Sequence, residues 1–193
     1  MKRWMWALAL LVLPSCGYNQ IQKLDVDVDK AASNIKVTLQ RRADLVPNLV
    51  ETVRGFAQQE VTVFTAVADA RSRLAGAVQG GNLQQMGEAN QNLTGALGRL
   101  IAISEAYPEL KSNENFRALQ DQLEGTENRI ATARQDYNAA VQEYNGYIRR
   151  FPQVLTAKVI GKGPREYFEL TSASAAEAPR VNFSQPRAAP APR

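Results

Sequence analysis

The sequence has 193 residues, a formal net charge of +4, 45% hydrophobic residues and 22% charged residues. This length and composition suit one globular domain with a core of its own. The charge bias is weak and aromatic residues are sparse at 7%, so nucleic acid is not an expected partner. The chain has no histidine, which removes the commonest general base and most zinc sites.

The N-terminus carries the clearest local signal. Residues 2–3 are cationic and residues 4–13 are apolar, a stretch shorter than the roughly 20 residues that span a bilayer. The string Leu13-Pro14-Ser15-Cys16 then resembles a bacterial lipobox, with leucine three positions before the cysteine and a small residue directly before it. Pro14 departs from the small residue usual at its position.

This pattern predicts a lipoprotein signal peptide over residues 1–15, with Cys16 as the lipidated first residue of the mature chain. Cys16 is the only cysteine, so no intrachain disulfide is possible. Acyl chains such as palmitate on this residue would hold the protein on a membrane of the bacterial cell envelope. The body would then face the periplasm or the exterior. The alternative is an ordinary secretory signal with an incidental cysteine.

Apolar residues follow at spacings of three and four, which predicts a first helix over about 20–42. Asp25, Asp27 and Asp29 alternate within it. A calcium loop would need a glycine and a distal glutamate that are missing here. We therefore expect these three aspartates to form a solvated acidic face.

Pro47 interrupts the helical pattern inside the stretch 41–51. Proline in a helix interior removes a donor and clashes one turn back, so this stretch is either a corner or a kink. Asp44 three residues earlier is typical of a helix start, which favours a corner. The second helix is then expected over about 45–79.

Two further helices complete the pattern. Gly80 and Gly81 predict the end of the second helix, and the third is expected over about 82–106. Ser112 or Asn113 is expected to cap the fourth, whose apolar stripe runs to Phe151.

Four amphipathic helices with short connections predict an all-α fold, an antiparallel four-helix bundle over residues 16–170. Residues 166–170 contain aromatic and apolar side chains that are expected to pack as a short tail. Residues 171–193 are rich in Ala, Pro and Arg and poor in large apolar side chains, so this tail is expected to be disordered.

Polar residues fall on or beside the apolar stripes. The Tyr-Asn pairs at 137–138 and 144–145 are seven residues apart and so share a helix face. One interpretation is a hydrogen-bonded layer that sets helix register, and the other is a recognition groove. The candidate residues are Arg41, Arg42, Asp44, Asn48, Glu105, Glu124, Glu127, Arg134, Asn138 and Asn145.

Several of these residues lie in four sequence segments that resemble the LemA family, at 41–53, 105–111, 123–131 and 133–138. The similarity runs from about residue 17 to residue 183. It implies an antiparallel four-helix bundle tethered to a membrane at its N-terminus. Many relatives use an uncleaved membrane helix as the tether, whereas this chain resembles the lipoprotein branch. The resemblance implies no settled biochemical activity.

These observations favour a non-enzymatic envelope scaffold or adaptor with no cofactor and no metal. Its expected partners are the membrane, through lipidated Cys16, and an unidentified envelope protein. One alternative is a ligand-binding or weakly catalytic bundle that uses Arg42, Glu127 and Asn138. Another is a structural spacer without a specific partner.

Overall fold

A computed structural model describes residues 17–168, and within this range the chain is helical with no strand. The signal peptide, Cys16 and the tail at 171–193 lie outside the described residues. The helices are α2 (Tyr18–Arg54), α3 (Val61–Gly80), α4 (Leu83–Ile103), the short 3-10 helix η2 (Ser104–Ala106), α5 (Pro108–Ser112), α6 (Glu114–Ile148) and α7 (Gln153–Val159). The all-α prediction is confirmed.

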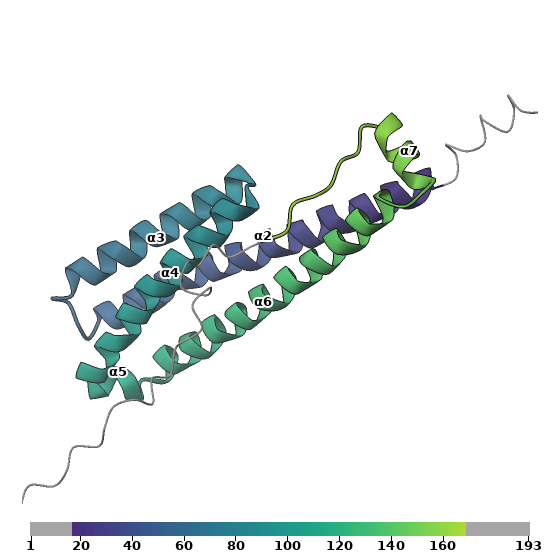
Figure 1. The fold of residues 1–193 in the computed structure, drawn as a ribbon. Coiled ribbons are helices and arrows are strands. Elements are labelled where there is room, and N and C mark those ends of the chain that lie inside the picture. Colours follow the sequence, from purple (N-terminus) through teal and green to yellow (C-terminus); the bar gives the residue numbers. More distant parts are fainter. Residues whose placement is uncertain (1–16, 169–193) are drawn as a thin grey trace, which may run out of the picture.

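The two longest helices, α2 and α6, run antiparallel along the whole molecule (Figure 1). At 1.5 Å per residue, the 37 residues of α2 extend over about 55 Å. Helices α3 and α4 pair with one another and pack on only one half of α2. The antiparallel four-helix bundle predicted over residues 16–170 is therefore not confirmed.

The other half of the α2–α6 pair is covered differently. Helix α7 turns back beside the start of α2, and the chain then runs along both long helices as an extended segment (Figure 1). We call residues 162–168 the strap. Phe168 at its end is only 5% exposed and belongs to the same apolar core as the helices. The predicted packing of 166–170 is thus seen for 166–168, and residues 169–170 lie outside the described range.

The helix ends follow the expected local rules. Asn82 caps α4 by accepting a hydrogen bond from the Gln85 backbone N–H at 3.0 Å. Asn113 caps α6 in the same way, with the Phe116 N–H at 3.0 Å. Gly81 ends α3 with φ of 76°, a conformation that glycine adopts without a Cβ penalty.

The corner predicted at 41–51 is wrong. Pro47 lies inside α2, which continues to Arg54, and the turn falls at residues 55–60 instead. Proline frees the carbonyl four residues earlier, that of the buried Ala43. Arg71 of α3 donates its Nε–H to this oxygen at 2.9 Å. A donor from another helix therefore replaces the hydrogen bond that Pro47 cannot make.

We expect Arg71→Ala to lower the free energy of unfolding by about 1–3 kcal/mol, because it leaves a buried carbonyl without a donor. Arg73→Ala is the matched control, since Arg73 is exposed on the same helix. Adding Pro47→Ala should restore much of the loss, because residue 47 then supplies its own N–H. Chemical denaturation of the wild-type protein and these three variants measures the losses, and equal losses for Arg71→Ala and Arg73→Ala would contradict the account.

Candidate functional site

The two Tyr-Asn pairs of α6 meet the strap. Asn145 donates from Nδ2 to the Arg165 carbonyl at 2.8 Å and accepts the Arg165 N–H on Oδ1 at 2.8 Å. Asn138 makes the same two bonds to the backbone of Phe168, at 3.2 and 2.8 Å. Each side-chain amide thus pairs with both backbone groups of one residue, as a neighbouring strand would.

The tyrosines complete the ladder. The Tyr137 hydroxyl donates to the Glu166 carbonyl at 2.9 Å, and the Tyr144 hydroxyl donates to the Gly163 carbonyl at 3.1 Å. Burial raises the pKa of both phenols, which stay protonated and able to donate at neutral pH. All six bonds are to backbone atoms, so they do not depend on the side chains of the strap.

The spacing of the two partners matches. Asn138 and Asn145 are seven residues apart, about 10.5 Å along a helix axis. Arg165 and Phe168 are three residues apart, about 10 Å in an extended chain. Side-chain amides seven residues apart on a helix can therefore bind residues that are three apart in an extended peptide. The surface is suited to holding extended chain through its backbone.

Acidic residues of α2 hold the other side of the strap. Asp25 is 5% exposed and accepts hydrogen bonds from Lys162 Nζ at 2.5 Å and from Arg165 Nη2 at 2.7 Å. Burial favours the neutral acid, but these two cations outweigh it and lower the pKa of Asp25. Asp29 adds an ion pair with Arg165 at 3.0 Å. The predicted solvated face is therefore wrong for Asp25, although Asp27 and Asp29 are exposed.

A second polar cluster lies deeper, where three helices meet. Arg42 of α2 is 4% exposed and donates to Asn90 Oδ1 of α4 at 2.6 Å. It also forms an ion pair with Glu127 of α6, whose side chain is half exposed. Burial lowers the pKa of Arg42, yet Glu127 opposes that effect. Arg134 of α6 stacks its guanidinium 4.9 Å over the Phe168 ring at the end of the strap and also interacts electrostatically with Glu127.

The remaining candidates do not join either cluster. Arg41, Asp44 and Asn48 are exposed on α2, where Asp44 accepts a hydrogen bond from Gln40 at 2.8 Å. Glu105 is exposed and pairs with Lys111 at 2.8 Å, and Glu124 is exposed on α6. The ten predicted residues therefore separate into two buried clusters and a set of surface side chains.

Four residues of these clusters were not among the predicted site residues: Asp25, Asn90, Lys162 and Arg165. Asp25 lies next to Leu24 on the apolar stripe of its helix, and this position was the one indication in the sequence that its carboxylate is buried. Lys162 and Arg165 were not detectable, because their contact with Asp25 spans 137 and 140 residues of chain.

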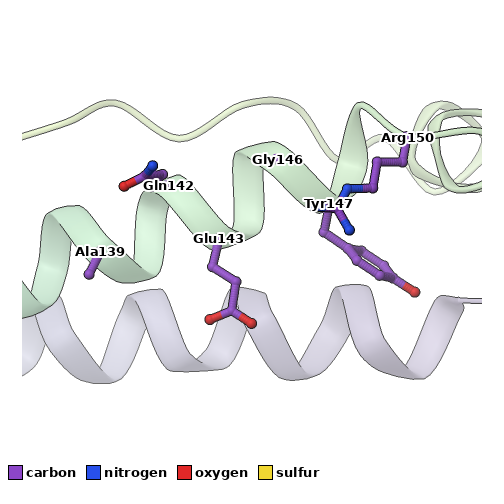
Figure 2. Close-up of a pocket in the computed structure, with 6 residues that line it drawn as sticks. All are labelled: Ala139, Gln142, Glu143, Gly146, Tyr147 and Arg150. Atoms are coloured by element: carbon purple, nitrogen blue, oxygen red, sulfur yellow. The ribbon is translucent and has the colours of Figure 1, made fainter.

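A surface hollow of about 540 Å³ lies over the same stretch of α6 and extends past its end (Figure 2). Its lining residues are Ala139, Gln142, Glu143, Gly146, Tyr147 and Arg150. Figure 2 shows Glu143 directed toward α2 and Gln142 directed away from it. Within residues 17–168, no group of three or more His, Cys, Asp or Glu side chains is placed to hold a metal ion. None of the helices described combines the length and apolar character needed to cross a membrane.

The LemA family profile matches residues 31–183, most of the chain. The chain belongs to the LemA family. Among curated relatives, the magnetosome proteins MamQ 1 and MamQ 2 of Paramagnetospirillum magneticum strain AMB-1 are each 33% identical over 175 residues, covering 79% of this chain. MamQ of Magnetospirillum gryphiswaldense strain MSR-1 is 31% identical over 174 residues, covering 78% of this chain. In each case the match covers 64% of the relative's length.

For this LemA-family chain, we expect Asn138→Ala combined with Asn145→Ala to release the strap. Four hydrogen bonds are lost, at about 1 kcal/mol each. The Arg165 and Phe168 amides should lose hydrogen-exchange protection, while amides of α3 and α4 keep theirs. Asn128→Ala, on an exposed position of α6, is the control. Unchanged protection at residues 165 and 168 would contradict this role.

Proposed function

We propose that this protein is a lipid-anchored bacterial envelope protein that acts as a non-catalytic helical scaffold or adaptor for protein partners. The observation that carries the proposal is the set of hydrogen bonds from the two Tyr-Asn pairs of α6 to the backbone of the strap. A helix whose side chains hold an extended segment through six hydrogen bonds to its backbone atoms is a docking surface for peptide segments. The strap occupies it in this structure.

The polar residues favour this function over ligand binding or catalysis. Arg42 is engaged by Asn90 and Glu127, and Asn138 is engaged by the strap backbone. A ligand-binding layer would direct these groups into a cavity, whereas here they bind other parts of the same chain. The magnetosome relatives add support from the family, since their name places them in an organelle rather than assigning a reaction.

The anchor is supported by the lipobox-like sequence and by the start of the fold. Tyr18 begins α2 two residues after Cys16, so lipid on Cys16 would place the end of a rigid rod directly at the bilayer. The docking surface on α6 would then project from the membrane. This arrangement suits a protein that collects partners near a bilayer.

We expect Cys16→Ser to abolish incorporation of labelled palmitate and to make the protein extractable from envelope membranes by a high-salt wash. Ser15→Gly keeps a small residue before the cysteine and should leave both properties unchanged. Membrane fractionation after the wash measures the effect. Retention of Cys16→Ser through the wash would contradict a lipid anchor at Cys16 and would show that another part of the chain holds the protein on the membrane.

Partner binding is tested with a photo-crosslinking amino acid in native envelopes. Tyr167 on the strap is 46% exposed and reports on the docking surface, while Phe56, 36% exposed at the α2–α3 turn, is the matched control position. We expect position 167 to yield a reproducible envelope protein that position 56 does not, and the yield should change in Asn138→Ala with Asn145→Ala. No reproducible partner from either position would count against an adaptor.

A further inference from the structure

Helix α7 exposes large apolar side chains. Leu155 and Val159 are one helical turn apart and are 53% and 79% exposed, and Phe151 just before the helix is 78% exposed. The opposite face of α7 packs on the rest of the molecule, because Thr156 and Ala157 are buried against the long helices. A short helix with one face in the core and three large apolar side chains in solvent indicates an interaction surface.

Cations surround this apolar face. Arg149, Arg150 and Lys158 are all exposed, and none forms an ion pair with a residue in the range 17–168. Helix α7 itself contains no acidic residue. Apolar side chains flanked by basic ones are typical of helices that lie in the surface of an anionic membrane. Each cation near such a surface increases membrane binding about fivefold.

The location of α7 identifies the same occupant. Gly17 packs against it so closely that an added Cβ would lie 3.1 Å from the Gln153 side chain. Cys16, the proposed site of the lipid, directly precedes Gly17 in the sequence. Tyr18, an aromatic residue of the kind enriched at bilayer interfaces, is 46% exposed at this end of the rod. Figure 1 shows α7 beside the start of α2, at the end of the molecule opposite α5.

We propose that Phe151, Leu155 and Val159, flanked by Arg149, Arg150 and Lys158, insert into the surface of an anionic lipid bilayer beside the N-terminal anchor. The inference rests on the proposed membrane attachment and goes beyond it, because it gives the rod a second contact. A single membrane contact at the N-terminus leaves the long helices free to rotate and tilt relative to the bilayer. Two contacts set the direction in which the α6 docking surface faces.

The test uses the full chain with Cys16→Ser, labelled at a single introduced cysteine with an environment-sensitive fluorophore. Leu155→Cys reports on α7, and Val37→Cys, 67% exposed on α2, is the matched apolar control. With phosphatidylglycerol vesicles we expect a blue shift, and quenching by brominated acyl chains, at position 155 and neither at position 37. Phosphatidylcholine vesicles, or Arg149→Gln, Arg150→Gln and Lys158→Gln together, should reduce the response at 155.

Several results would overturn the proposal. An unchanged spectrum at 155 with vesicles present would exclude insertion, and an equal response at 37 would show non-specific adsorption. A blue shift at position 155 without lipid would show that protein, not lipid, covers the apolar face of α7. If the shift does not depend on protein concentration, the covering segment is residues 1–16 of the same chain. If it does depend on concentration, a second copy of the chain covers the face. None of these results bears on Cys16 lipidation, which the palmitate and salt-wash experiment decides separately.

Discussion

Lys162→Ala combined with Arg165→Ala is expected to destabilise the protein more than any other pair of surface-charge changes. Both cations are only about one-third exposed, and they hold the 5% exposed carboxylate of Asp25. Removing them leaves a buried charge unpaired, which costs about 3–5 kcal/mol where water cannot enter. Because the strap lies at the surface, we expect about 2–4 kcal/mol after allowing for solvation. Thermal and denaturant unfolding measure the loss.

Two controls separate the buried charge from other effects. Lys23→Ala with Lys30→Ala removes the same net charge from exposed positions of α2 and should change stability by less than about 0.5 kcal/mol per residue. Adding Asp25→Leu to the strap variant should recover stability, because no unpaired carboxylate remains. If the triple variant is no more stable than the double variant, the buried charge is not the cause.

The pH dependence of this loss has a defined sign. In the wild-type protein the pKa of Asp25 is lowered, so its contribution is fully present above the ordinary value of 3.8 and is lost as the pH falls through the lower folded pKa. In the strap variant burial acts alone and raises that pKa, so the carboxylate destabilises the fold increasingly as the pH rises. The difference in unfolding free energy between the two proteins should therefore begin to shrink above the ordinary value of 3.8, as the pH falls through the raised pKa of Asp25 in the variant, and should shrink further below 3.8 as the wild-type contribution is lost.

Glu127→Ala is expected to have the second-largest effect. It leaves the Arg42 guanidinium, which is 4% exposed, with Asn90 as its charge-neutral partner. The Glu127 side chain is 46% exposed, so the full cost of breaking a buried pair is reduced, and we expect about 1–3 kcal/mol. Glu124→Ala, an exposed glutamate on the same helix, should lie within about 0.5 kcal/mol of wild type. Equal melting temperatures for the two variants would contradict the buried pair.

Replacing the whole cluster tests whether it serves only the fold. Arg42→Met, Asn90→Leu and Glu127→Leu together remove the charges and the amide that would otherwise be left unsatisfied. Such apolar replacements of buried ion pairs are often neutral or stabilising. A stable triple variant that keeps its crosslinking partner assigns the cluster to folding alone. A stable triple variant that loses the partner assigns it a part in recognition.

Pro47 shows a limit of predicting helix ends from neighbouring residues alone. Pro47 and the upstream Asp44 both favour a corner, yet α2 continues because Arg71 supplies the missing donor. That donor lies 28 residues away in the chain. The true turn at 55–60 has no proline, and its one local marker is Gly55.

The Tyr-Asn pairs show the same limit at the candidate site. Their heptad spacing places them on one face, as predicted, and the sequence left open whether that face sets helix register or recognises another segment. The structure shows their partner to be the backbone of residues 163–168, which has no side-chain pattern to reveal it. Bonds to backbone are invisible to an argument from residue types, because any residue offers the same N–H and carbonyl.

The amino-acid sequence by itself determined the all-α fold class, the cap of α6 at Asn113, the glycine stop at Gly81 and membership of the LemA family. These depend on periodicity, on residues within one or two turns of each other and on long matching strings. Only the tertiary structure decided that α2 passes through Pro47, that Asp25 is buried under two cations and that a strap replaces two helices over half of the rod. Each of these depends on a partner that lies far along the chain, and folding alone brings the two groups together.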